Sequence, residues 1–132
     1  MSDGVALYNF FRSLPTDLTI YNAGATYSAA VIAYLGAKKR KTSASAAFML
    51  HRTAITFQSA KSAQLEALAD ATTIDDVRTE KIIRDNCRLT EEQWLMLDRR
   101  DLYFSGVDAV TTGISHEVAE FSPPPGAQLF FV

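Results

Sequence analysis

The sequence is poor in the residues that build disulfides and metal centres. It contains one cysteine, Cys87, so no disulfide can form within the chain and a reducing, intracellular setting is the default expectation. One cysteine and two separated histidines cannot supply the three or four ligands of a zinc site. We therefore expect no metal and no cofactor, and we place the protein in the cytoplasm.

Long apolar runs and a strong charge bias are also lacking. The longest apolar segment, residues 29–35, is far shorter than the roughly 20 residues of a membrane-spanning helix. The opening residues, Met-Ser-Asp-Gly, have neither the basic nor the apolar region of a signal peptide. A formal net charge of −2 favours neither nucleic acid nor an anionic membrane as a partner. The short basic cluster at residues 38–41 is expected to be the solvated end of a helix.

What remains is the composition of a single globular domain. The 132 residues are 48% hydrophobic and 21% charged, which is typical of a chain that folds around a core rather than a disordered one. We assign residues 1–118 to one domain and residues 119–132 to a proline-rich tail. The end of the tail, residues 129–132, is apolar enough to dock on this chain or on a neighbour.

One stretch organises the rest of the chain. Residues 18–21 predict a strand, Gly24 a tight turn, and residues 28–35 a helix that ends at Gly36 and is apolar enough to be buried. Ser28 stands at the start of this helix. Serine is a preferred N-cap, and a serine at a strand-to-helix turn can also project its hydroxyl from the end of a sheet. The sequence leaves both interpretations open.

Strands and helices alternate along the remaining domain. The predicted elements are a helix at residues 5–14, a strand at 46–50, a capped helix beginning at Thr90, a capped helix at 105–113 and a strand at 114–118. Apolar strands separated by helices are typical of a parallel α/β arrangement that is covered on both faces.

Residues 53–88 differ from the rest because they are polar, helix-prone and poor in core residues. We expect a long helix, a break at residues 71–73, and a second helix over residues 74–87. A helical excursion of this kind is typical of an interaction surface, often for oligomerisation. The alternative is a loosely packed surface hairpin.

Three polar residues are candidates for catalytic groups. Ser28 precedes the buried helix, His51 follows an apolar strand, and Asp101 follows the helix that begins at Thr90. Catalytic groups gather at the C-terminal ends of parallel strands, where a histidine can take a serine proton and a carboxylate can hold the imidazole tautomer. Each also has a structural explanation: a helix cap, a hydrogen-bonded strand terminus, and a loop carboxylate paired with a neighbouring arginine.

Three segments resemble the Clp protease proteolytic subunit family. They are Gly24-x-x-x-Ser28 with the small-residue helix that follows it, Phe48-Met-Leu-His51, and Arg100-Asp101-Leu-Tyr-Phe-Ser-Gly-Val-Asp-Ala-Val-Thr-Thr-Gly113. They resemble the nucleophile, histidine and aspartate segments of the family, in the family's order and at close to its spacing. The likeness extends over about residues 4–118.

This resemblance implies an α/β fold, the ClpP/crotonase-like superhelix of strand–helix units, with residues 53–88 as a protruding helical handle through which copies of the chain form a homo-oligomer. It implies a serine endopeptidase that acts on unfolded polypeptides inside an oligomeric chamber fed by a separate ATP-driven unfoldase. Ser28 would form the acyl-enzyme, His51 would act as general base and then acid, and Asp101 would orient His51. Asp98 is a competing carboxylate that matches the family less well.

The sequence departs from the family at two places. It begins at Met1-Ser-Asp-Gly4, without the glycine segment whose N–H groups form part of the oxyanion hole, and Tyr27 replaces a small residue before the serine. Either the sequence is part of a longer chain, or the missing segment comes from elsewhere, or the protein has lost proteolysis. The second hypothesis is therefore a catalytically impaired structural or regulatory subunit that assembles through the same handle. A crotonase-type acyl-thioester enzyme ranks third, because it leaves His51 and Asp101 unexplained.

Overall fold

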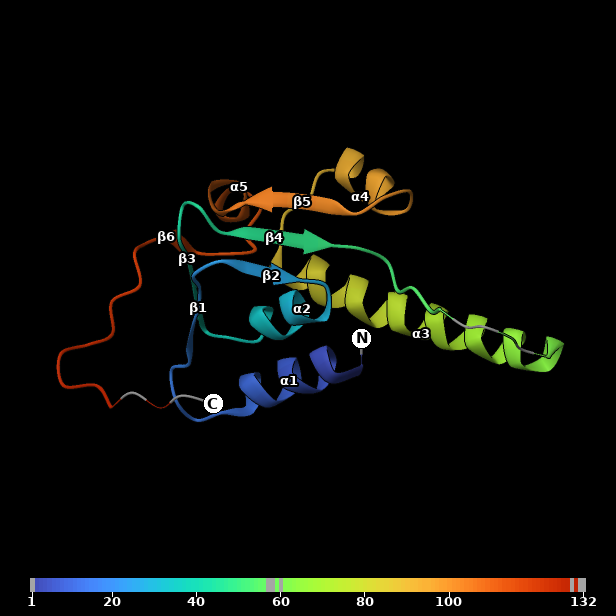
Figure 1. Cartoon of the computed structure of the whole chain (residues 1–132), viewed down its shortest axis with the longest axis horizontal. Helices are drawn as coiled ribbons and strands as arrows, with labels where there is room; N and C mark the ends of the chain where they lie inside the picture. Colours follow the sequence, from blue (N-terminus) through green and yellow to red (C-terminus); the bar gives the residue numbers. More distant parts are fainter. Residues whose placement is uncertain (1, 57–58, 60, 129, 131–132) are drawn as a thin grey trace.

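The structure is a computed structural model that describes residues 2–56, 59, 61–128 and 130 (Figure 1). Its elements, in chain order, are α1 (Ser2–Ser13), β1 (Thr19–Asn22), β2 (Ala25–Tyr27), α2 (Ala29–Leu35), β3 (Lys39–Thr42), β4 (Ala47–Leu50), α3 (Ser62–Asn86), α4 (Glu91–Leu97), β5 (Leu102–Ser105), α5 (Gly106–Thr111) and β6 (Glu117–Val118). The helices predicted at residues 5–14, from Thr90 and at 105–113 are confirmed as α1, α4 and α5. Strands β2 and β3 are absent from the prediction.

The strands form two small sheets, and the strands from β1 to β4 alternate between them along the chain. One sheet has the order β1-β3-β6 and is parallel throughout, and the other has the order β2-β4-β5. In the second sheet β2 and β4 are parallel, whereas β4 and β5 are antiparallel. The predicted parallel arrangement therefore holds for three of the four pairs. β5 runs the other way because α4, which leads into it, lies near the end where β4 finishes (Figure 1).

Helix α2 is buried, as its apolar composition predicts. All five of its residues from Val31 to Leu35 are buried, and α1 packs against it. Two glycines allow this close packing. A Cβ atom on Gly4 would lie 2.3 Å from the carbonyl oxygen of Ala29, and one on Gly36 would lie 2.7 Å from that of Tyr8. Helix α1 thus supports the helix that follows Ser28.

The basic cluster at residues 38–41 is not a solvated helix end, so that prediction is wrong. Helix α2 ends at Leu35, and most of the cluster lies in β3, between β1 and β6. Arg40 is 6% exposed, and burial lowers its pKa. Its guanidinium donates hydrogen bonds to the carbonyl groups of Leu35, Ala37, Gly113 and Ile114. Strand propensity did not predict β3, because the burial of the charged Arg40 side chain depends on carbonyl acceptors from distant segments of the chain.

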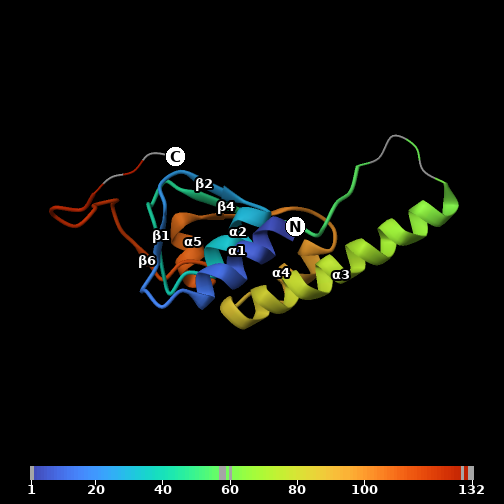
Figure 2. The same cartoon turned by 90° about the horizontal axis from the view of Figure 1, so that it is seen from below.

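Residues 53–88 contain one long helix rather than two, so the predicted break at residues 71–73 is wrong. The hydroxyls of Thr72 and Thr73 bond to the carbonyl of Ala69 in the preceding turn instead of capping a new helix. Helix α3 extends away from the sheets (Figure 2), and its buried residues, Thr79, Ile82 and Ile83, all lie toward its C-terminal end. Its N-terminal part is therefore a projection from the body of the domain.

The start of the tail lies against the first sheet. The ring of Phe121 is 5.3 Å from that of Tyr21, whose hydroxyl donates to the carbonyl of Ala119. Of the apolar end predicted to dock, Phe130 is 81% exposed and the remaining residues, 129 and 131–132, lie outside the described residues. Among the helices that the structure describes, none combines the length and apolar character needed to cross a membrane.

Replacing Arg40 tests how far the first sheet depends on this buried cation. We expect Arg40→Met to lower the free energy of unfolding by about 2–4 kcal/mol, because buried carbonyl groups lose their donor. Urea denaturation measures the change. Exposed Lys39 on the same strand supplies the control, and Lys39→Met should stay within about 0.5 kcal/mol of the parent. Equal effects of the two substitutions would contradict this account.

Candidate active site

The pairing of β2 with β4 brings Ser28 and His51 together. The strands are parallel neighbours, with Tyr27 opposite Met49, so their C-terminal ends meet at one edge of the sheet. Ser28 directly follows β2, and its backbone N–H donates to the carbonyl of Met49 over 2.8 Å. His51 directly follows β4. Residues 23 positions apart in the chain thus become neighbours.

Ser28 is not the side-chain cap of α2. It occupies the N-cap position, but its side chain makes no capping hydrogen bond. Its hydroxyl oxygen lies 2.7 Å from Nε2 of His51 instead. Ser28 is also the only non-glycine residue with a positive φ, 57°, among those the structure describes. A serine held in this backbone conformation on a strand-to-helix turn projects its hydroxyl away from the sheet.

The hydrogen-bond partners of His51 determine its tautomer. Its Nδ1 contacts the carbonyl oxygen of Arg52. A carbonyl oxygen can only accept, so Nδ1 carries the hydrogen and Nε2 of the neutral ring is free to accept from the Ser28 hydroxyl. This is the tautomer that a histidine needs to take a proton from a serine. Ser28 and His51 therefore form a pair arranged for proton transfer.

Asp101 lies beside this pair but is not joined to it. The antiparallel pairing of β4 with β5 ends with Leu50 opposite Leu102, so the next cross-strand position places Asp101 opposite His51. The Asp101 side chain is exposed and, within the described part of the chain, forms no hydrogen bond or ion pair. The alternative expectation, pairing of Asp101 with Arg99 or Arg100, is not seen among the described residues either, and Arg100 donates to the Met96 sulfur instead.

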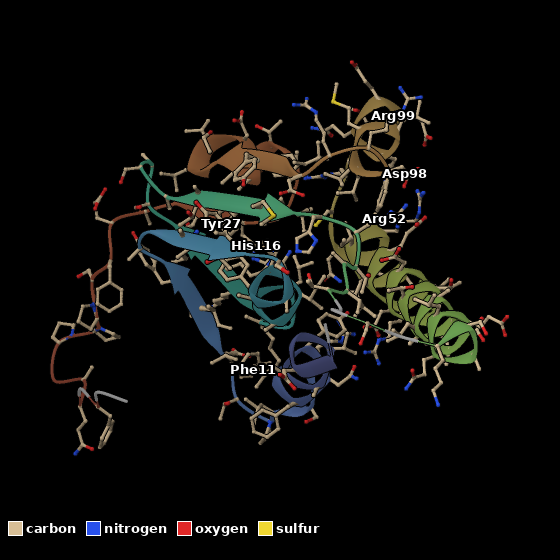
Figure 3. All side chains as sticks on the ribbon, turned by 45° about the vertical axis from the view of Figure 1, so that its right-hand side comes forward. Phe11, Tyr27, Arg52, Asp98, Arg99 and His116 are labelled. Atoms are coloured by element: carbon tan, nitrogen blue, oxygen red, sulfur yellow. The ribbon has the colours of Figure 1, made fainter. Side chains whose placement is uncertain are left out.

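Asp98, the competing carboxylate, binds Arg52 rather than His51. Its Oδ1 accepts from Nε and Nη2 of Arg52 at 2.8 and 2.7 Å (Figure 3). The second partner of Arg52 is Glu80 on α3, at 2.7 Å. Sequence analysis did not select Arg52. Its position next to His51 was the one sequence feature that could have pointed to it. Its partners Glu80 and Asp98 lie 28 and 46 residues away in the chain, so no local pattern reveals the ion pairs.

Two exposed tyrosines lie on the sheet surface next to the pair. Tyr27 and Tyr103 flank Met49 in the β2-β4-β5 register, and their rings meet edge to face at 6.1 Å. They are 43% and 65% exposed. An exposed aromatic surface beside a nucleophile provides apolar area for a substrate side chain. Tyr27, which is bulky for its position, is thus placed on this surface.

Neither the single cysteine nor a metal cluster provides an alternative centre among the described residues. Burial raises the pKa of the Cys87 thiol to about 12, which keeps it protonated and unreactive. Within the described residues, no group of three or more histidine, cysteine, aspartate or glutamate side chains is placed to hold a metal ion. The chemistry that the described side chains support best is therefore nucleophilic attack by serine.

Comparison with known proteins identifies the family and the fold of the chain. The sequence model of a family described as Clp protease matches residues 1–122. Among solved structures, a ClpP1 mutant from Listeria monocytogenes superimposes with a TM-score of 0.76 and 21% sequence identity, over 91% of this chain and 67% of that chain. This match confirms the predicted ClpP/crotonase-like α/β fold. No curated protein sequence matches the chain.

The positive φ of Ser28 predicts an unusual response to glycine. We expect Ser28→Gly to be more stable than Ser28→Ala by about 1 kcal/mol, because both lose the hydroxyl but only glycine adopts this conformation without strain. Ala30→Gly in α2 is the control and should be destabilising by roughly 0.5–1 kcal/mol. Thermal and urea unfolding of the three variants measure the difference. Equal stability of the two Ser28 variants would show that the backbone is unstrained.

Proposed function

Because this chain belongs to the Clp protease family, a family of serine peptidases, we propose that it is an endopeptidase subunit that uses Ser28, His51 and Asp101. The observation that carries the proposal is the hydrogen bond of 2.7 Å between the Ser28 hydroxyl and Nε2 of His51. The substrates are unfolded polypeptides, which reach the site inside a chamber built from several copies of the chain. A separate ATP-driven unfoldase supplies them in the cytoplasm.

The reaction proceeds through an acyl-enzyme. Ser28 Oγ attacks the carbonyl carbon of the peptide while Nε2 of His51 takes the hydroxyl proton. His51 then gives this proton to the leaving amine as the C–N bond breaks, which leaves the acyl group on Ser28. In the second half, water attacks the ester carbonyl and passes a proton to His51. The bond between the acyl carbon and Ser28 Oγ then breaks, His51 returns the proton to Oγ, and the peptide leaves with a free carboxyl group.

Asp101 is the third member of the proposed triad. In the active arrangement, its carboxylate accepts the Nδ1 hydrogen of His51 and stabilises the imidazolium ion that forms during attack. The cross-strand position of Asp101 opposite His51 supports this role. A change of acceptor from the Arg52 carbonyl to the Asp101 carboxylate is the rearrangement that the proposal requires.

Helix α3 is the proposed surface for assembly of the homo-oligomer. Leu65, Ile74 and Val77 are 40%, 63% and 67% exposed on it. All three lie toward the N-terminal side of the buried residues of α3, on the part that projects from the domain. Exposed apolar side chains on a projecting helix favour contact with another copy, as the family resemblance implies for residues 53–88.

The second candidate is a catalytically impaired structural or regulatory subunit. The observation that favours it is that His51 Nδ1 contacts the Arg52 carbonyl, whereas the Asp101 side chain forms no bond to any of the described residues. Both candidates predict assembly, but only the peptidase predicts a reactive serine.

A fluorophosphonate probe separates the two candidates. We expect labelling at Ser28 alone, located by intact mass and peptide mapping, and no labelling of Ser28→Ala. His51→Gln should lower the labelling rate by about 10³-fold or more, since the general base is lost. Asp101→Asn should slow it less, because the Ser28–His51 pair survives. A folded oligomer that stays unlabelled would support the structural subunit.

Introducing charged residues at exposed apolar positions of α3 tests the proposed assembly surface. We expect the double variant Ile74→Asp/Val77→Asp to shift the chain to a smaller species, because unpaired charges would be buried at the contact. Light scattering coupled to size exclusion measures the mass. Val107→Asp on α5, which replaces a side chain that is 57% exposed, should leave the mass unchanged. An unchanged oligomer in the α3 variant would exclude this part of the helix as the contact.

A further inference from the structure

We infer that Arg52 is a positioning residue whose side chain decides which acceptor His51 Nδ1 meets, an inference that rests on the proposed roles of Ser28 and His51. The Arg52 side chain is bound on two sides. It pairs with Glu80 on α3 at 2.7 Å. It also pairs with Asp98, which follows α4, at 2.7 Å; Figure 3 labels Arg52 and Asp98. Although partial burial works against the charged form, the hydrogen bonds to Glu80 and Asp98 raise the pKa of Arg52. The side chain is thus a charged bridge between two helices.

The peptide unit that follows Arg52 is held in the same way. Its N–H, which belongs to Thr53, donates to Oδ1 of Asp76 over 2.7 Å, and its carbonyl group contacts His51 Nδ1. Asp76 and Glu80 are one turn apart on α3, so the side chain and the backbone of this segment are tied to one face of the helix. The carbonyl oxygen that contacts His51 is therefore fixed by contacts outside the proposed triad.

This arrangement competes with Asp101 for a single hydrogen atom. Nδ1 carries one hydrogen, and the Arg52 carbonyl accepts it. A carboxylate is the stronger acceptor because its hydrogen bond is charge-assisted, and it also stabilises the imidazolium ion. The two ion pairs of Arg52 hold the weaker acceptor in place, while Asp101, at the next cross-strand position, has no bonding partner among the residues that the structure describes.

Glu80 connects this bridge to the rest of α3. Its second carboxylate oxygen accepts from Arg84 at 2.8 Å, and the Arg84 guanidinium lies 4.0 Å from the ring centre of Trp94 on α4. The hydrogen bonds from Arg52 and then from Arg84 lower the pKa of Glu80, which keeps it ionised at neutral pH. The Arg52 bridge is therefore fully charged under ordinary conditions.

Arg52→Gln removes both ion pairs but keeps the backbone carbonyl, so it tests the bridge directly. On the full chain, we expect it to raise the rate of fluorophosphonate labelling at Ser28 by about tenfold or more, because Asp101 can then orient His51. Arg52→Lys, which retains the charge but not the fixed set of donors, should label at a rate between those of the parent and Arg52→Gln. Asp85→Asn removes an ion pair to Lys81 on the same helix and should have no effect. The gain should disappear in Arg52→Gln/Asp101→Asn.

An unchanged or slower rate in Arg52→Gln, or a gain that survives Asp101→Asn, would overturn the inference. A second readout does not depend on turnover. The imidazole signals of the two histidines are separated by nuclear magnetic resonance with His116→Asn as the assignment variant. The His51 Nδ1 proton should move downfield in Arg52→Gln, as its acceptor becomes a carboxylate, and should return when Asp101→Asn is added.

The two readouts distinguish failure of this inference from failure of the proposed function. A Ser28 that is unlabelled in every variant, with a His51 proton that still moves in Arg52→Gln, would reject the peptidase and retain the role of Arg52. A proton that does not move in the folded variant would reject the role of Arg52, whatever the labelling shows. Circular dichroism confirms folding of each variant.

Discussion

The parallel pairing of β2 with β4 is the constraint on which the candidate site depends. It places the C-terminal ends of the two strands side by side and lets the Ser28 N–H donate to the carbonyl of Met49. The Ser28 hydroxyl, after β2, can then reach the ring of His51, after β4. Because β2 has only three residues, its pairing with β4 contributes few backbone hydrogen bonds to hold the strand in place. Its support comes from α2, which is buried along most of its length, and from α1, which packs on α2. The chemistry at one sheet edge therefore relies on helix packing behind it.

The two nitrogens of His51 connect different parts of the molecule. Nε2 faces Ser28 and the sheet, whereas Nδ1 faces the segment that leads into α3. In most serine peptidases a carboxylate fills the second role, and here a main-chain carbonyl does so in the described structure. Since a carbonyl sets the same tautomer but adds no negative charge, it preserves the orientation of the ring without stabilising the imidazolium ion. The geometry of the Ser28–His51 pair therefore does not depend on a carboxylate at Nδ1.

Charged side chains in this domain take structural roles that their sequence context does not reveal. Arg40 is buried in a strand, where carbonyl groups from distant segments surround its guanidinium, and Arg52 bridges two helices through Glu80 and Asp98. In both cases the planar guanidinium supplies several donors at fixed angles, which a lysine could not match. The arginines hold together segments that the small sheets alone would leave weakly connected.

Local patterns in the sequence determined the buried character of α2, the capped starts of α4 and α5, and the end of α1 before Pro15, because periodicity and capping act between near neighbours. The choice of Ser28, His51 and Asp101 as a catalytic triad came instead from the resemblance to a family, and their roles stay a prediction. The tertiary structure alone decided that residues 39–42 form a strand, since its hydrogen bonds come from β1 and β6. It also decided that the main-chain carbonyl of Arg52, not the carboxylate of Asp101, contacts His51 Nδ1, at a place where Glu80 and Asp98 bind the Arg52 side chain. These outcomes depend on partners far away in the chain, which no local pattern of residues encodes.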